Sequence, residues 1–250
     1  MDFLLSALLR SVFCLLLCVL GLPRATHRRY LLGGAAVAAA FSPYGLARLW
    51  YAARGQPGAQ PSYLNWTGQL LLLLVGLAAM ALLLSQAGWT RADLGLRTTF
   101  RPGTGRDVAR YLLPLLLLEL GVLGLLVPGG PVSAEFVVFQ FTAPGLIEEL
   151  LMRGVLLALL DRALPDRVCV LGAELGWGAV VSSLFFGAAH GLRVGADLQL
   201  SFLLAPAVLP TVGGFVLAWC RARSGSLLLP ILVHSGLNGV VQLIALLKAD

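Results

Sequence analysis

The chain has 250 residues, of which 58% are hydrophobic and 12% are charged, and its mean hydropathy is +0.88. Soluble domains average about 45–50% apolar and about 25% charged residues, so this composition excludes an ordinary soluble protein and indicates a polytopic membrane protein. The net charge of +6 does not indicate nucleic-acid binding, because the arginines lie between apolar runs and do not alternate with aromatic residues.

Eight apolar runs approach the roughly 20 residues that a helix needs to cross a bilayer. They fall at about 3–22, 30–50, 67–87, 111–130, 136–160, 171–192, 200–220 and 227–247. Breaks rich in glycine and proline separate several of them, at 55–58, 101–105 and 127–131. The predicted fold is therefore all-α, a polytopic membrane helix bundle with about eight transmembrane helices.

Basic residues are unevenly distributed between alternate connections. Counted from the N-terminus, the odd-numbered connections contain twelve arginines, whereas the even-numbered connections and the C-terminal tail contain four basic residues. Because cytoplasmic connections are enriched in Lys and Arg, we expect the odd-numbered connections in the cytoplasm and both termini outside. Arginine outnumbers lysine 17 to 1 and Ala and Leu are abundant, which is typical of a GC-rich bacterial genome. The predicted location is a bacterial inner membrane.

Three charged side chains, Glu148, Glu149 and Arg153, lie in the middle of the fifth apolar run. A charge at the bilayer centre costs about 2.5–3.5 kcal/mol on insertion scales, so charged residues there indicate a functional site by default. Glu149 and Arg153 are four residues apart and share a helix face, so they can form an ion pair. Glu148 points elsewhere and is left without that partner.

Two of the three histidines also lie in apolar runs. Phe186 and His190 are four residues apart, as are His234 and Asn238, so each pair shares one helix face. Small residues beside both pairs favour a close approach of neighbouring helices; they are Gly187, Ala188, Ala189, Ser235, Gly236 and Gly239. A helix bundle could therefore bring Glu148, His190, His234 and Asn238 to one cavity.

These motifs resemble those of the CPBP family of intramembrane endopeptidases, which is named for CAAX proteases and bacteriocin-processing enzymes and is also called Abi. The matching residues, in this order on three helices, are Glu148-Glu149-x-x-x-Arg153, Phe186-x-x-x-His190 and His234-x-x-x-Asn238. Residues 89–97 are also similar to a stretch often found upstream in these proteins. The resemblance covers roughly residues 89–247, so we expect a CPBP-like catalytic membrane domain at 89–250 after a three-helix membrane segment at 1–88.

The resemblance implies a protease that uses a glutamate, requires no cofactor and cleaves a membrane-embedded or membrane-associated peptide or protein. The implied catalytic residues are Glu148, His190, His234 and Asn238, and the supporting ones are Glu149, Arg153 and Phe186. Glu148 would activate water, and His190 would help to position that water. His234 and Asn238 would stabilise the oxyanion, while Glu149 and Arg153 would hold the helix geometry. For a bacterial host, a peptide precursor, a signalling membrane protein or a bacteriocin-related target is expected rather than a prenylated CAAX tail.

Other functions are compatible with the same residues. Two histidines and a glutamate can bind zinc, which makes a zinc-dependent intramembrane metalloprotease the main alternative, although the His-Glu-x-x-His spacing is absent. Intramembrane Glu, His and Arg also mark ion pathways, so a transporter is a second alternative, although no inverted repeat is evident. A non-catalytic membrane binding protein is the third, since an isolated intramembrane His or Asn usually only bridges helices by a hydrogen bond.

Overall fold

The computed structural model of the chain describes residues 66–194 and 200–249, together with Val12, Leu16, Tyr30 and Gly34. The helices predicted at 3–22 and 30–50 therefore lie almost entirely outside the described residues. The division into segments 1–88 and 89–250 stays a prediction.

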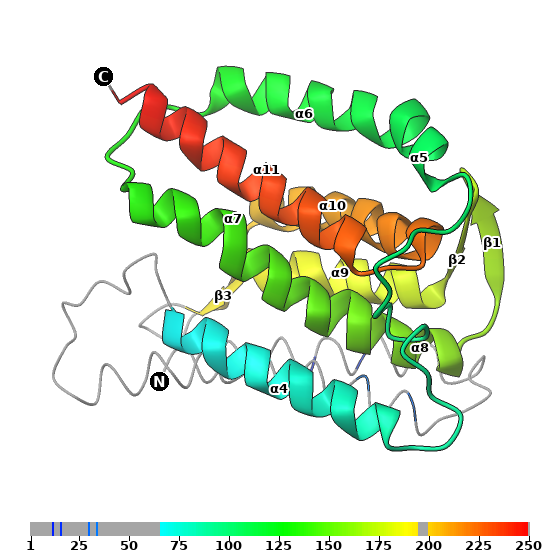
Figure 1. Ribbon diagram of the computed structural model, residues 1–250. Helices are drawn as coiled ribbons and strands as arrows, with labels where there is room; N and C mark the ends of the chain where they lie inside the picture. The colour runs from blue at the N-terminus through cyan, green and yellow to red at the C-terminus, as the bar shows by residue number, and fades with distance from the viewer. Residues whose placement is uncertain are drawn as a thin grey trace, which may run out of the picture.

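The described part of the chain is mainly helical (Figure 1). Its longer helices are α4 (Trp66–Leu84), α6 (Leu113–Leu126), α7 (Ala134–Glu149), α9 (Trp177–Gly191), α10 (Leu204–Ser224) and α11 (Leu228–Leu247). Helix α5 (Thr104–Asp107) and the π-helix η2 (Val108–Leu112) lead into α6, and the π-helix η3 (Leu150–Leu156) and α8 (Leu157–Ala163) continue α7. The strands are β1 (Arg167–Val170), β2 (Ala173–Gly176), β3 (Leu192–Val194) and β4 (Leu200–Phe202).

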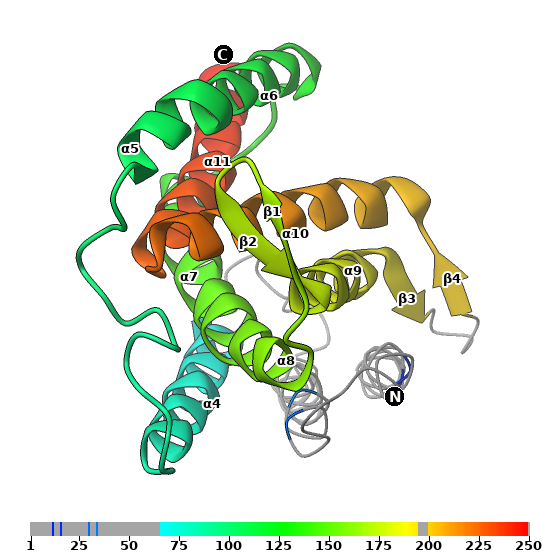
Figure 2. The same cartoon turned by 90° about the vertical axis from the view of Figure 1, so that its right-hand side faces the viewer.

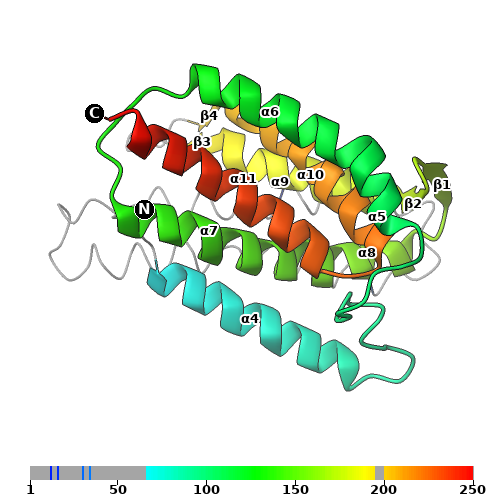
Figure 3. The same cartoon turned by 45° about the horizontal axis from the view of Figure 1, so that its top comes forward.

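The long helices lie side by side along a common direction (Figures 1 and 3). The continuous helix α7–η3–α8 runs through the middle and packs against α4 and α11, while α9 and α10 pack against each other. Helix α6 lies at the outside of the bundle next to α11, as the end-on view in Figure 2 shows. The helices that carry the candidate residues therefore occupy the centre of the bundle.

Three helical segments are long and apolar enough to cross a membrane in the described part of the chain: Thr104–Leu126, Leu204–Ser224 and Leu228–Leu247. Their surfaces fit contact with lipid, because side chains such as Leu118 and Leu125 on α6 are 66% and 84% exposed. The structure thus confirms a mainly helical fold with candidate membrane-spanning helices. The number of about eight spans stays a prediction.

Two antiparallel hairpins depart from the predicted all-α fold. In the first, Val170 is opposite Ala173, which leaves Leu171 and Gly172 as a two-residue turn with φ values of 47° and 79°. Positive φ at both turn positions is typical of a type I′ turn, whose twist matches that of the flanking strands. The β-branched valines of β1 also favour a strand over a helix. Local turn chemistry therefore replaces the first turns of a predicted helix by a hairpin.

The second hairpin pairs β3 with β4, with Leu192 opposite Phe202. The two hairpins displace the N-terminal ends of two predicted helices toward the C-terminus. The helix predicted at 171–192 is limited to α9, and the helix predicted at 200–220 is shifted to α10. The predicted boundaries of these two helices were therefore wrong by one to two turns.

Glycines allow the central helices to approach closely. A Cβ atom at Gly187 in α9 would overlap Thr211 in α10, and one at Gly239 in α11 would overlap the ring of Phe141 in α7. The space around Gly236 is open. The predicted close packing is confirmed at Gly187 and Gly239, which hold α9 against α10 and α11 against α7.

Candidate active site

The helix that carries Glu148 and Glu149 is irregular on both sides of this pair. Pro144, one turn earlier, has no N–H, so one intrahelical hydrogen bond cannot form there. Directly after Glu149, the chain continues as the seven-residue π-helix η3. Segments of π-helix are rare and frequently occur at functional sites. The two glutamates therefore lie where the regular helix geometry is interrupted.

The predicted ion pair between Glu149 and Arg153 is present. Arg153 Nη1 donates to Glu149 Oε1 at 2.8 Å, and both side chains are fully buried. Arg153 Nη2 also donates to the carbonyl oxygen of Gly214 at 3.1 Å, and the guanidinium carbon lies 4.8 Å from the centre of the Phe186 ring. A buried charge requires a partner and hydrogen bonds, which Arg153 obtains from three helical segments. Arg153 therefore links η3 to α9 and α10.

Glu149 also contacts His234, which the sequence did not predict. His234 Nδ1 lies 2.9 Å from the Glu149 oxygen that accepts from Arg153. A carboxylate oxygen only accepts, so Nδ1 carries the hydrogen and donates it. The other ring nitrogen, Nε2, is then the one available to a substrate or water. Glu149 therefore fixes the orientation of His234 in addition to neutralising Arg153.

Phe186 lies between the two histidines. The centre of its ring is 4.7 Å from that of His190 and 5.7 Å from that of His234. His190 Nδ1 is 2.8 Å from the carbonyl oxygen of Phe186. Because a carbonyl oxygen only accepts, Nδ1 donates, and the neutral His190 ring has Nε2 free to accept a hydrogen bond.

Helix α9 is shorter than the predicted helix that carries His190. The helix predicted at 171–192 would place His190 close to the outer surface of the membrane. Helix α9 has only 15 residues, which corresponds to about 22 Å, whereas the hydrocarbon core is about 30 Å thick. His190 lies in the last turn of this short helix, and the rings of His190 and His234 both contact Phe186.

Glu148 and Asn238 have no direct partner in the part of the chain that the structure describes. Both side chains are half-buried, and neither forms a hydrogen bond or an ion pair with a described residue. Glu148 is close enough to Arg153 and His234 to interact with them electrostatically. Asn238 lies one turn after His234 on the same face of α11. The structure thus brings all predicted residues to one region, with Glu148 and Asn238 unbonded.

A metal site is not evident from the donor residues. Within 66–194, 200–249 and the four isolated positions, no three His, Cys, Asp or Glu side chains are grouped so as to hold a metal ion. That the reaction needs no cofactor stays a prediction. The arrangement of donor side chains among the described residues does not test it.

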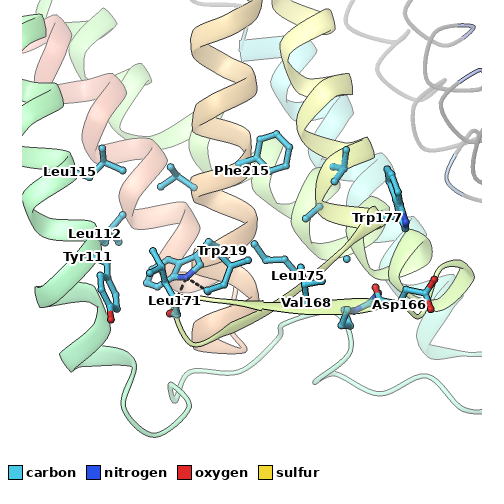
Figure 4. Close-up of a pocket in the computed structure, with 16 residues that line it drawn as sticks. Tyr111, Leu112, Leu115, Asp166, Val168, Leu171, Leu175, Trp177, Phe215 and Trp219 are labelled. Carbon is cyan, nitrogen blue, oxygen red and sulfur yellow. Dashed lines mark hydrogen bonds between the residues drawn. The ribbon is translucent and has the colours of Figure 1, made fainter.

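An apolar cavity of about 610 Å³ lies away from these residues, between η2–α6, α10 and the hairpin β1–β2. Trp177, Phe215 and Trp219 are among the side chains that line it (Figure 4). Trp219 Nε1 donates to the carbonyl oxygens of Val170 and Leu171 at 3.1 and 3.3 Å, which fixes the hairpin beside α10. The candidate catalytic residues do not line this cavity.

The helical membrane fold and the buried polar site are those of an integral membrane protein with a functional site between its helices. Residues 131–240 match the family model described as type II CAAX prenyl endopeptidase Rce1-like. This segment contains every candidate residue from Glu148 to Asn238. No curated protein and no solved structure gives a significant match.

Residues 131–240 are thus similar to the CAAX protease family, in agreement with the resemblance that the sequence motifs predicted. The protein is therefore an enzyme of the protease class, and the family acts on membrane-associated protein substrates.

Proposed function

We propose that this protein is an intramembrane endopeptidase in which Glu148 activates the water molecule that cleaves a peptide bond. The proposal rests on the different hydrogen bonding of the two adjacent glutamates. Glu149 accepts from Arg153 and His234, whereas Glu148 has no hydrogen-bond partner among the described residues. Glu148 is therefore the carboxylate that is available to accept a proton from water.

The first step is the attack of water on the substrate carbonyl. Glu148 takes one proton from water, and the resulting hydroxide adds to the carbonyl carbon. His190 supports this step because its Nε2 can accept a hydrogen bond from the same water while its Nδ1 is bonded to Phe186. The side chain of His190 is exposed, so the described residues do not cover it. The C–N bond of the intermediate then breaks as Glu148 returns the proton to the leaving nitrogen, which gives a carboxylic acid and an amine.

The oxyanion of the tetrahedral intermediate requires hydrogen-bond donors. A proton on His234 Nε2 supplies one donor, and the Glu149 carboxylate at Nδ1 stabilises the positive charge of the doubly protonated ring. The side-chain amide of Asn238, one turn away, supplies a second donor. In this mechanism Glu149 and Arg153 are positioning residues, because they act through His234 and the helix geometry.

The proposed location is a bacterial inner membrane with the arginine-rich connections in the cytoplasm. Support comes from the described connections, which lie together at one end of the bundle. The backbone N–H of Leu227 donates to the carbonyl of Gly95 at 2.9 Å, and that of Arg101 donates to the carbonyl of Ser224 at 2.9 Å. Two arginine-rich connections that are far apart in sequence thus lie at the same end of the bundle. This is the arrangement expected if both are on the cytoplasmic side of the membrane.

Substrate trapping tests the proposed function. A Glu148→Gln protein expressed in native membranes should retain uncut substrate that copurifies with it and is identified by mass spectrometry. The matched control is Glu135→Gln, which changes an exposed glutamate in the first turn of α7. Purified wild-type protein and the control should cut the trapped substrate in vesicles. Failure of both to cut any trapped protein would contradict a proteolytic function.

A further inference from the structure

A polar cavity of about 470 Å³ is lined by residues of α8, of the hairpin β1–β2, of the C-terminal end of α10 and of the connection that precedes α5. Three carboxylates line it. So do six arginines: Arg97, Arg101, Arg153, Arg162, Arg167 and Arg221. Residues from three of the predicted cytoplasmic connections thus form one positively charged wall.

The carboxylates do not neutralise all these arginines. Asp93 Oδ2 is 3.3 Å from Arg162 Nη2, and Asp161 Oδ1 is 3.3 Å from Arg167 Nη2. Arg153 already belongs to the ion pair of the candidate active site. Among the described residues, no carboxylate lies within 4.0 Å of the remaining arginines; they are Arg97, Arg101 and Arg221. The cavity therefore has an excess of positive charge.

Arg221 is the most deeply held of these three arginines, because its side chain is only 8% exposed. Its Nη2 donates to the carbonyl oxygens of Ala92 and Asp93 at 3.3 and 2.7 Å, and its Nε has no acceptor among the described residues. Gly95, with a φ of 74°, lies against the guanidinium, and a side chain at this position would overlap it. Arg221 is therefore hydrogen-bonded only to neutral carbonyl groups, and the carboxylates of Asp161 and Asp93 attract its charge without forming an ion pair with it.

We propose that this cavity binds a phosphate anion, supplied either by the headgroup of an anionic phospholipid or by soluble phosphate. Guanidinium groups are well suited to phosphate, because their planar N–H groups pair with two phosphate oxygens at once. The cavity lies where arginine-rich connections leave the bundle, which is also the level at which anionic headgroups attract basic residues. The excess of arginines over carboxylates in its lining favours an anion whatever the catalytic mechanism.

Arg97→Gln is the test variant, because Arg97 lines the cavity, is exposed and has no hydrogen bond from its side chain to any described residue. Arg91→Gln is the matched control, since Arg91 is exposed in the same connection but does not line the cavity. Native mass spectrometry measures the phosphatidylglycerol retained after extraction from vesicles of phosphatidylcholine and phosphatidylglycerol. Thermal unfolding in neutral detergent with added inorganic phosphate measures binding of the free ion.

We expect the wild type and Arg91→Gln to bind in at least one of these experiments, and Arg97→Gln to bind about tenfold more weakly in the same one. Retention of phosphatidylglycerol identifies a lipid headgroup as the ligand, and stabilisation by inorganic phosphate identifies a soluble anion. Arg101→Gln should weaken binding in the same direction. Absence of binding in both experiments, or equal binding by Arg97→Gln and Arg91→Gln, would overturn the proposal.

Discussion

Replacing Arg153 by alanine should lower the free energy of unfolding by about 3–5 kcal/mol, the usual cost of breaking a buried ion pair. The substitution leaves the fully buried Glu149 with His234 as its remaining hydrogen-bond partner. The second carboxylate oxygen of Glu149, Oε2, already has no hydrogen bond to a described residue. It also removes the contacts with Gly214 and Phe186. Because net stability is typically about 5–15 kcal/mol, the loss is a large fraction of the total.

Denaturation by SDS of the purified protein in mild detergent measures this change, and cleavage per folded molecule is measured in parallel. Activity per folded molecule should fall less than tenfold, since Glu149 still holds His234. The matched control is Arg106→Ala, whose side chain is 81% exposed, and it should change stability by less than about 1 kcal/mol. Equal stability of the two variants, with activity abolished only in Arg153→Ala, would refute the positioning role and make Arg153 catalytic.

His234→Ala should lower the cleavage rate by about 10²–10³-fold, as expected for loss of an oxyanion donor, and a loss below tenfold would contradict that role. Gly239→Ala should destabilise the protein by about 1–3 kcal/mol, because the added Cβ would overlap the ring of Phe141 in α7. Gly236→Ala is the control and should not destabilise it, because the space around Gly236 is open. Equal unfolding curves for the two variants would contradict the packing. In a protein whose exposed native cysteine is replaced, a cysteine introduced at Thr98 should be labelled only from the cytoplasm and one at Gly130 only from outside. Labelling of both from the same side would contradict the topology.

The sequence predicted the helices well where an apolar run ends at a clear break. The run at 227–247 corresponds to α11, and the run at 67–87 corresponds to α4. The prediction from sequence failed before α9 and α10, where β2 and β4 lead into apolar helices with at most one residue between strand and helix. Such runs have no periodicity that separates strand from helix. The available signal was the Leu171-Gly172 turn after β-branched residues.

Contacts within one helix were also predictable. The spacing of Glu149 and Arg153 determines their common face, so the ion pair followed from helical periodicity. Contacts between helices did not follow in the same way. Glu149 and His234 are 85 residues apart, and Arg153 and Gly214 are 61 residues apart. These contacts depend on how the helices pack, which the spacing of motifs along the chain does not determine.

The central claim, that Glu148 activates water without a metal ion, is tested most directly by one cleavage experiment. Purified wild-type and Glu148→Gln proteins are compared on a membrane peptide after exhaustive chelation, with the metal content measured alongside. The wild type should remain active, and Glu148→Gln should be about 10²–10⁴-fold slower, the usual effect of removing a general base. Undiminished cleavage by Glu148→Gln would contradict the assignment of the base, and wild-type activity that disappears with chelator and returns with stoichiometric zinc would identify a metalloprotease instead.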